Sequence, residues 1–404
     1  MNAAANVFFL ILRVFSLYFL AVSLLGLCRR LRPATAVKQR RFAILIAARN
    51  EESCIAGLIE SLRAQDYPSE LFDIWVLPNN CTDRTAEVAR RAGAKVMEMP
   101  AAIRSKGAAL HAAAGALLRG SHRYDAFCVF DADNEADPEF LSEMNRALDR
   151  TAIVKSRILA KNRTQAGISA CYEIYFCSAN HFLNRARETL GLSARVIGTG
   201  FAIRRDLLEE LGGFPCRTLT EDAELYAVCL AYGVRIGYCE TAVTYDEEPV
   251  TWRASLVQRR RWMSGIMQVS RLTLPELVRN FLCQPSLNRL DGILQLTFPF
   301  LQGITPFFTL AALTAGSISL QGLPASLLTA YIGCIVMAIA ALALEKRLDR
   351  KLVGGILLYP LFMASFLPLQ TLALFKTQTV WHEIRHSGVR LSAAERTLRR
   401  ETVA

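Results

Sequence analysis

The sequence lacks the features that mark small secreted, repetitive or disordered proteins. It has no internal repeat and no low-complexity tract, and its 11 cysteines include no C-x-x-C pair. Only 21% of its 404 residues are charged, whereas 52% are hydrophobic. This composition excludes a mainly disordered chain, and a chain of this length needs neither a disulfide scaffold nor structural zinc to fold. We therefore expect a folded protein with reduced, packed cysteines.

The sequence has fewer acidic than basic residues, with 36 Asp and Glu and 47 Lys and Arg, which gives a net charge of +11. Such an excess could indicate nucleic-acid binding. Much of it, however, flanks long apolar blocks, where it would meet anionic lipid headgroups. The mean hydropathy of +0.24 is also high for a soluble protein of this size. The sequence therefore predicts an integral membrane protein whose partner is membrane lipid and not nucleic acid.

The first apolar block, 6–28, is interrupted only by Arg13 and is long enough to span a bilayer as a helix. No Lys or Arg precedes this block, whereas basic residues are frequent from 29 to 41. A cleavable signal peptide has the opposite arrangement, and the positive-inside rule puts the basic side in the cytoplasm. We expect 1–41 to be a transmembrane signal anchor with a basic linker.

Three further apolar blocks without charged residues, 293–318, 323–344 and 352–375, predict transmembrane segments within 291–375. Basic residues precede the third block and recur in the tail, 376–404, so the charges favour a cytoplasmic position for both. If the third block crossed the membrane once as a straight helix, one of these two basic regions would lie outside the cytoplasm. Pro360 and Pro368 would also break a straight helix. We interpret the third block as re-entrant or as a bent hairpin, with a kinked simple span as the alternative.

Between 42 and 250, short β-rich runs alternate with longer amphipathic runs, which indicates an α/β domain with a mostly parallel sheet. After the first strand, apolar residues recur at the spacing of a helix face laid on a sheet. From 251 to 290, tryptophans and aliphatic residues mix with arginines, as in interfacial amphipathic helices that couple a domain to the bilayer. The candidate strands are 42–47, 72–77, 95–99, 126–130, 153–158 and 196–203.

Asp131 and Asp133 directly follow an apolar run and so stand at the carboxyl edge of the sheet, where open α/β sheets bind ligands. Two carboxylates one residue apart can hold a Mg²⁺ or Mn²⁺ ion that takes its remaining ligands from water and a diphosphate. The alternative is structural: the two aspartates would merely end the strand and cap the next turn.

A second acidic cluster, Glu221, Asp222 and Glu224, lies in the first turn of a candidate helix. Acidic residues there gain about 0.3–1 kcal/mol from the helix dipole, so this cluster alone favours a structural role. A third cluster, QRRRW, offers the guanidinium of Arg261 for a phosphate and the indole of Trp262 for a sugar ring. By itself, a basic amphipathic helix is more often a lipid anchor.

Together with AARNEE and NNCTDRT, the motifs DAD, TED and QRRRW occur in the order and spacing of one known family. Over roughly residues 42–275 the chain resembles the membrane-integrated family 2 glycosyltransferases, the group of cellulose, chitin, hyaluronan and poly-N-acetylglucosamine synthases. The resemblance implies a GT-A-type domain, a nucleotide-diphosphate-sugar donor, most often a UDP-sugar, and a glycan or lipid-linked acceptor. It also implies a bacterial inner-membrane protein whose catalytic domain, 42–250, faces the cytosol.

The same resemblance assigns roles to individual residues, with Asp222 as the catalytic base. The donor and its cofactor would be bound by Ala47, Glu51, Asn79, Lys106, Asp131, Gln258 and Arg261, with the metal held by Asp131 and Asp133. The acceptor side would be formed by Gly198, Thr199, Gly200, Phe201, Glu221 and Trp262.

The chemistry of such a transfer explains why one base suffices. A diphosphate leaving group is stabilised by the cation and by Arg261, so it needs no general acid. The base then acts on the acceptor hydroxyl on the opposite face of the sugar ring, and the anomeric configuration inverts. The sequence departs from the family at the base-binding end, where Asn79 replaces an Asp of many members and Arg49 replaces an aromatic residue. An amide can still pair with uracil.

Alternative functions remain open at this point. A stacking indole near a membrane entrance favours repeated addition to a growing polysaccharide, and single transfer to a lipid-linked acceptor is the alternative. The HEIRH motif at 382–386 matches the zinc-peptidase pattern H-E-x-x-H, but Arg385 puts a cation between the ligands. A catalytically dead binding module would lack a key carboxylate. The enzymatic interpretation requires Asp131, Asp133 and Asp222 to converge on one pocket.

Overall fold

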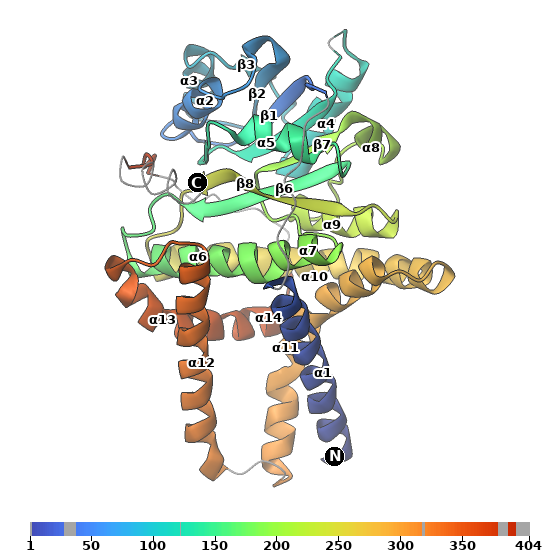
Figure 1. The fold of residues 1–404 in the computed structure, drawn as a ribbon, viewed down its shortest axis with the longest axis vertical. Coiled ribbons are helices and arrows are strands. Elements are labelled where there is room, and N and C mark those ends of the chain that lie inside the picture. The colour runs from blue at the N-terminus through green and yellow to red at the C-terminus, as the bar shows by residue number, and fades with distance from the viewer. Residues whose placement is uncertain (1, 28–37, 122, 317–319, 379–386, 393–404) are drawn as a thin grey trace.

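The computed structural model describes residues 2–27, 38–121, 123–316, 320–378 and 387–392. Figure 1 shows an α/β domain, a layer of helices that lie crosswise beneath it, and three helices that extend away from both. Residues 387–392 return to the α/β domain, where Ser387 Oγ donates a hydrogen bond to Glu247 and Leu391 N donates one to Glu135. The cysteines among the described residues are all free.

The α/β domain is built on one eight-stranded sheet with the order β3-β2-β1-β4-β7-β6-β8-β5. β1 pairs in parallel with β2 and β4, and β6 with β8, whereas β7 is antiparallel to both of its neighbours. The predicted mostly parallel sheet is confirmed, and the carboxyl ends of β1, β4, β6 and β8 share one edge. The strands are β1 (Phe42–Ala48), β2 (Phe72–Pro78), β3 (Lys95–Val96), β4 (Ala126–Asp131), β5 (Glu135–Ala136), β6 (Ile153–Ala160), β7 (Phe201–Arg204) and β8 (Ile236–Asp246).

The predicted strand 95–99 is shortened to Lys95–Val96 and β5 was not predicted, but two other differences bear on the site. The candidate strand 196–203 is wrong in its first half, because Gly198 and Gly200 adopt φ values of +58° and +62°, which an extended strand cannot accommodate. The sequence analysis also missed β8, whose polar residues Glu240 and Thr241 interrupt the apolar pattern of a buried strand. Both differences matter for function, because the glycine turn and the end of β8 both contribute to the site.

Helices cover both faces of the sheet, and the alternating side chains of β1 show how. Phe42, Ile44 and Ile46 pack against α2, α3 and α5 on one face, whereas Ala43 and Leu45 pack against α4, α8 and α9 on the other. The apolar stripe predicted for α2 is wholly buried. These helices are α2 (Ile55–Arg63), α3 (Thr85–Arg91), α4 (Lys106–Arg119), α5 (Phe140–Ala147), α8 (Arg205–Glu210) and α9 (Glu221–Ala231).

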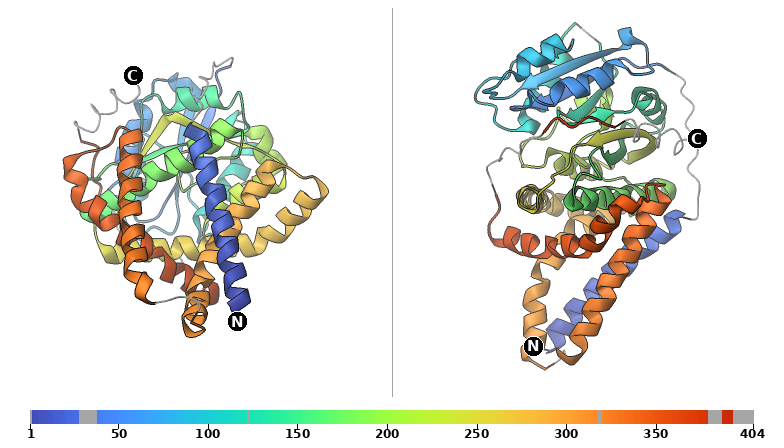
Figure 2. Two further views of the ribbon diagram at one scale, coloured as in Figure 1. Left: turned by 60° about the horizontal axis from the view of Figure 1, so that its bottom comes forward. Right: turned by 90° about the vertical axis from the view of Figure 1, so that its left-hand side faces the viewer.

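The crosswise layer lies between the sheet and the extended helices (Figure 2). In it, α6 packs on α13, and the long helix α10 packs on α9 and α14. The predicted amphipathic segment 251–290 thus begins with one 32-residue helix that contacts the α/β domain on one side and apolar helices on the other. The elements of the layer are α6 (Gly167–Ser178), the π-helical segment η2 (Ala179–Arg185), α7 (Ala186–Leu190), α10 (Trp252–Cys283), α13 (Val353–Ala364) and α14 (Phe366–Phe375).

Among the described residues, four segments are long and apolar enough to cross a membrane: Ala3–Leu27, Leu287–Thr314, Leu323–Leu344 and Arg350–Phe375. The first three form α1 (Asn2–Leu27), α11 (Leu287–Thr314) and α12 (Leu323–Leu344), which extend away from the domain. The fourth bends at Ser365 into α13 and α14, which lie across the ends of the other three (Figures 1 and 2). It is not a hairpin, because α14 packs on α10 and α11 rather than back along α13. Both of its basic flanks therefore lie on the domain side.

Candidate active site

One cavity lies at the carboxyl edge of the sheet, between the sheet and the crosswise layer. We call it the edge cavity. Ends of β1, β4 and β8 meet there with the first turns of α4 and α9. The three acidic side chains on which the enzymatic interpretation depends share its wall. The predicted site residues that line it are Ala47, Glu51, Asn79, Lys106, Asp131, Asp133, Gly198, Glu221, Asp222, Gln258, Arg261 and Trp262.

Lys106 lies between two carboxylates of the edge cavity. Its Nζ is 2.7 Å from Asp131 Oδ1 and 2.9 Å from Glu221 Oε1, and it donates to Gly198 O at 3.1 Å. Ser105, whose side chain caps α4, fixes the start of the helix that presents this lysine. Burial alone would lower the pKa of Lys106, but the negative charges of Asp131 and Glu221 outweigh it and raise the pKa. The lysine therefore stays charged and ties the end of β4 to the start of α9.

Asp222 is oriented by a backbone amide. Gly198 N donates to Asp222 Oδ2 at 2.5 Å. This contact depends on the left-handed conformation of Gly198, which glycine adopts without steric cost. Asp222 also lies in the first turn of α9, where free N–H groups favour negative charge. The carboxylate is thus held in one orientation at the cavity wall.

A buried network behind the wall connects Asp131 to β8. Thr199 Oγ1 accepts a hydrogen bond from Asp131 N at 3.0 Å and donates to Asn134 Oδ1. Asn134 Nδ2 in turn donates to Asp246 Oδ1 at 2.9 Å. The expectation that Thr199 forms the acceptor wall is corrected here, because its side chain is fully buried behind the cavity. Thr199 fixes the backbone of Asp131 and the amide of Asn134 instead of lining the cavity.

The sequence analysis missed a second group of acids on the cavity wall. Asp246, Glu247 and Glu248 follow the end of β8 and line the edge cavity. Burial and the charges of Asp133 and Asp131 raise the pKa of Asp246 well above its usual range. Burial and nearby acids, Asp246 first, raise the pKa of Glu248 in the same way. These acids directly follow a strand, which is the pattern that predicted the position of Asp131. The pattern was missed here because β8 itself was not recognised as a strand.

Lys155 lies buried beneath these carboxylates in β6. Its Nζ donates to a neighbouring carbonyl of β6 at 2.9 Å and to Gly200 O at 3.4 Å. Burial lowers the pKa of Lys155 to about 7, although the charges of Asp246, Asp222 and Asp131 oppose this shift. Lys155 therefore braces the glycine turn from below. No motif in the sequence distinguished it from an exposed lysine.

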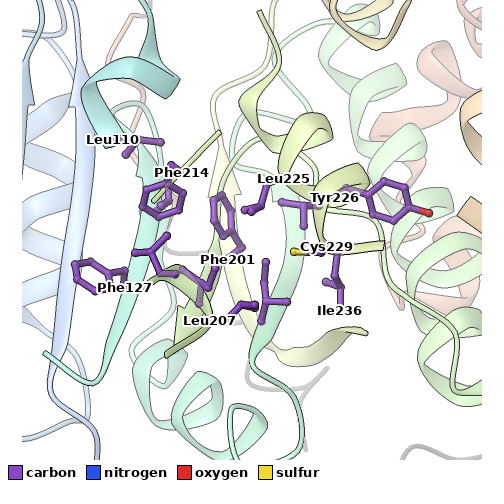
Figure 3. Close-up of a cluster of buried hydrophobic side chains, with 14 of the residues drawn as sticks. Leu110, Phe127, Phe201, Leu207, Phe214, Leu225, Tyr226, Cys229 and Ile236 are labelled. Atoms are coloured by element: carbon purple, nitrogen blue, oxygen red, sulfur yellow. The ribbon is translucent and has the colours of Figure 1, made fainter. Parts of the chain in front are cut away.

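The expected acceptor residues Gly200 and Phe201 do not line the edge cavity. A Cβ atom at Gly200 would lie 2.4 Å from Ser156 Oγ, so this glycine permits close packing of β6 on the turn. Phe201 is 1% exposed, and its ring faces Phe214 in a core cluster with Phe127 (Figure 3). Because successive strand residues point to opposite faces, the first residue of β7 points into the core. Residues 196–198 form this part of the wall instead.

Amide groups organise the part of the cavity where the family resemblance predicts the nucleotide base. Asn79 Nδ2 donates to Ser105 O at 3.3 Å, and Asn79 Oδ1 accepts from Asn80 Nδ2 at 2.9 Å. Glu51 N donates to Thr85 Oγ1 at 2.8 Å, which fixes the chain that leaves β1. The amide predicted to contact a base is thus held in one orientation by the protein.

α10 presents the polar and aromatic side chains of its QRRRW motif on two faces. Gln258, Arg261 and Trp262 stand at i, i+3 and i+4, so they share the face that lines the cavity. Gln258 Oε1 and Arg261 Nε are buried without a hydrogen-bond partner among the described residues. Arg259 points the other way and donates to a carbonyl of α13 at 2.9 Å. The ring of Trp262 stacks on Tyr175, with centroids 6.2 Å apart.

Asp131 and Asp133 fit a divalent cation as hard oxygen ligands. The ion pair between Asp131 and Lys106 shows that this end of the cavity attracts positive charge. In the described part of the chain, no group of three or more His, Cys, Asp or Glu side chains could hold a metal ion. A cation here would therefore need ligands from water and substrate as well. The H-E-x-x-H motif at 382–386 lies outside the described residues.

Sequence comparison identifies the family. The model of "Glycosyltransferase like family 2" matches residues 39–265. The chain belongs to this family. It is 28% identical over 237 residues to "Probable glycosyltransferase YdaM" of Bacillus subtilis (strain 168), covering 56% of this chain and 55% of that protein. It is 26% identical over 243 residues to the beta-monoglucosyldiacylglycerol synthase of Synechocystis sp. (strain ATCC 27184 / PCC 6803 / Kazusa), covering 57% and 49%.

The chain thus spans about half the length of these two curated relatives. Among solved structures, it is similar to the mannosyltransferase PcManGT from Pyrobaculum calidifontis in complex with GDP-Man and Mn²⁺. The TM-score is 0.58 at 17% identity, and the match covers 88% of this chain and 98% of that one. This likeness confirms the GT-A-type fold that the family resemblance implied.

Proposed function

We propose that the protein is an inverting glycosyltransferase that moves a hexose or N-acetylhexosamine from a nucleoside-diphosphate sugar to a membrane-borne acceptor. The observation that carries this proposal is the convergence of Asp131, Asp133 and Asp222 on the edge cavity. A UDP-sugar is the proposed donor, because the fixed amide of Asn79 can pair with uracil. Membership of the glycosyltransferase family supports the assignment.

The donor would bind with its diphosphate between the strand edge and α10. Asp131 and Asp133 would hold a Mg²⁺ or Mn²⁺ ion, which when bound neutralises charge on the leaving diphosphate. Arg261 Nε is a buried donor without a partner among the described residues, and Arg261 lines the same space, so its N–H is available to a phosphate oxygen. Gln258 would approach the diphosphate through its amide N–H group, because its Oε1 atom can only accept a hydrogen bond. Because these groups stabilise the leaving diphosphate, no general acid is required there.

Asp222 is the proposed general base. The hydrogen bond from Gly198 N occupies Oδ2 and fixes the orientation of the carboxylate. Asp222 would accept the proton of the acceptor hydroxyl as that oxygen attacks the anomeric carbon, and the configuration would invert. Glu221 is less suited to this role, because it is bound to Lys106 at 2.9 Å.

The acceptor would enter from the membrane side. On that side the edge cavity is lined by apolar and aromatic residues of α6, η2 and α10, and we call this part the membrane end. α1, α11 and α12 are proposed to span the bacterial inner membrane, with the catalytic domain in the cytosol, and the basic flanks support this orientation. The residues of the membrane end are Ile158, Tyr175, Phe176, Leu183, Arg195, Val196, Ile197, Trp262, Met263 and Ile266.

The structure favours single transfer to a lipid-borne acceptor over growth of a polysaccharide. The indole of Trp262, which was expected to hold a growing chain, rests against Tyr175. The membrane end is mainly apolar, as a lipid requires and a polar glycan does not. The relative from Synechocystis is named for a glycolipid product, which supports the same order of preference.

The Asp222→Asn substitution tests the proposal. We expect sugar transfer to fall by about 10²–10⁴-fold, the usual contribution of a general base, with nucleotide binding unchanged. Radiolabelled sugar transfer into extracted lipid measures the first quantity, and calorimetric titration with UDP and GDP measures the second. Asp206→Asn, at a surface carboxylate that pairs with Arg204, is the matched control. Full transfer activity in Asp222→Asn would exclude this base.

A further inference from the structure

Arg195 is a cation at the membrane end of the edge cavity. Among the described residues, its guanidinium makes no hydrogen bond or ion pair, unlike its neighbours. The difference is specific to this side chain, because the region offers acidic partners to other arginines. Three of them are paired: Arg185 with Glu240 at 3.0 Å, Arg187 with Asp291 at 2.8 Å and Arg235 with Glu188 at 2.6 Å.

The backbone of Arg195 is fixed against the membrane side of the domain. Arg195 N donates to Asn184 Oδ1 at 2.9 Å, and Asn184 Nδ2 donates back to Arg195 O at 3.3 Å. Asn184 belongs to η2, the π-helical segment in which Phe182 O accepts a hydrogen bond from Ser23 of α1 at 3.0 Å. Two hydrogen-bonded steps therefore connect Arg195 to the first membrane helix.

The surroundings of Arg195 make an unpaired charge costly. Arg195 is half-buried, and Phe176 and Leu183 on the same cavity wall offer its guanidinium no counter-charge. Burial raises the pKa of the Tyr175 hydroxyl, and the positive charge of Arg195 opposes that rise, so the charge acts inside this part of the cavity. A guanidinium in apolar surroundings is stabilised when an anion pairs with it.

We propose that Arg195 binds a phosphate group carried by an anionic lipid, and that this lipid is the acceptor. The inference rests on the proposed transferase function and specifies its acceptor class. A guanidinium offers parallel N–H donors that match two phosphate oxygens. The donor diphosphate is an unsuitable partner, because Gln258 and Arg261 serve it from α10. Arg195 lies three residues before Gly198, whose N–H group holds the base Asp222, so the phosphate would lie near the accepting oxygen.

Lipid binding by the purified full-length protein in detergent tests this inference. Intrinsic tryptophan fluorescence follows the titration, because Trp262 lines the same cavity. Phosphatidic acid and diacylglycerol with identical acyl chains are the two probes, and inorganic phosphate is the third. We expect phosphatidic acid to bind about tenfold more tightly than diacylglycerol, in proportion to one charge-assisted contact. Inorganic phosphate at millimolar concentration should not abolish that preference.

Arg195→Gln should remove the preference for phosphatidic acid and leave diacylglycerol binding unchanged. Arg195→Lys should retain part of it, because an ammonium keeps the charge but not the paired donors. Arg204→Gln, at a surface arginine bound to Asp206, is the matched control and should behave as the wild type. Unchanged nucleotide binding shows that each variant is folded.

Equal binding of the two lipids by the wild type would overturn the inference, as would a preference that survives in Arg195→Gln. Complete competition by inorganic phosphate would assign the site to a soluble anion and overturn the lipid assignment. The proposed transferase function fails separately, if Asp222→Asn retains sugar transfer. The lipid preference is measured without turnover, so the two failures can be told apart.

Discussion

The two ends of the edge cavity are built by different means. The proposed donor end is formed by strand ends and helix starts, and its lysine is paired within the protein, because Lys106 binds Asp131 and Glu221. The membrane end is formed by the end of β6, α6, η2, residues 195–197 and α10, and the guanidinium of Arg195 there has no partner among the described residues. The comparison teaches that the acidic groups of one end are held by a lysine of the protein itself, whereas the cation at the other end is left for the proposed ligand to pair.

This difference agrees with the ligands proposed for the two ends. A nucleotide diphosphate carries several charges in a fixed geometry, so prearranged charges avoid the cost of reorganisation. A lipid arrives with flexible apolar chains, and an apolar wall can accommodate them without specific contacts. Substitutions at the two ends should therefore change different measured quantities.

Of the substitutions that test this comparison, the one with the largest expected effect lies at the donor end. Asp133→Asn removes one of two proposed hard ligands for the cation, so nucleotide affinity in the presence of Mg²⁺ or Mn²⁺ should fall by about 100-fold. Calorimetric titration with and without a chelator measures this effect. In chelator, the wild type and the variant should bind equally weakly. A variant with metal-dependent nucleotide binding like that of the wild type would remove Asp133 from the metal site.

A smaller effect is expected at the membrane end. Trp262→Ala removes an aromatic surface from the cavity wall, which is worth about 0.5–1.5 kcal/mol, or roughly two- to tenfold in the KM for the lipid acceptor. The KM for the donor should not change. Trp252→Phe, at a tryptophan of α10 that does not line the cavity, is the control. A rise in the KM for the donor instead would show that Trp262 acts at the donor end and not at the membrane end.

The smallest effect concerns Lys155, which lies beneath both ends. Its pKa is about 7 in the folded protein, below the value of about 10.4 in an unfolded chain. Between these values only the unfolded state binds the proton, so the contribution of Lys155 to stability rises with pH from about 7 to about 10. Below pH 7 the folded protein must bury a charged lysine.

Lys155→Met removes this cost. The Tm of the variant relative to the wild type should therefore be higher at pH 6 than at pH 9, by a few degrees. Thermal unfolding in chelator measures the difference. The groups that face Lys155 are Asp246 on β8, Asp222 on α9, Asp131 on β4 and Lys106 on α4, and all are present in both proteins. A pH-independent difference in Tm would show that Lys155 does not titrate in this range.

Much of the domain could be predicted because local patterns and tertiary packing agree in it. The run after Arg41 is apolar at every position and forms a strand that is buried on both faces, and the stripe of α2 is buried as its spacing predicts. The acids after β4 could be placed at the sheet edge by the same argument. The acids after β8 could not, because polar residues hide that strand from the periodicity test.

The remaining site residues depend on contacts that no local pattern encodes. Phe201 follows the glycine turn as an acceptor residue should, yet the register of β7 turns its side chain into the core. Lys155 and Arg195 are single basic residues without a motif. One is buried under the carboxylates and the other lines the cavity, because segments far apart in the sequence pack around them.

The sequence by itself determined the membrane segments, the α/β domain and the acidic and aromatic motifs, since hydrophobic length, periodicity and strand-end chemistry are local properties. Tertiary structure alone decided that the last apolar block lies across the other helices, that Thr199 and Phe201 are withdrawn from the cavity, and that Arg195 enters it. Burial and charge pairing depend on which distant segments meet, and that is settled only when the whole chain has folded.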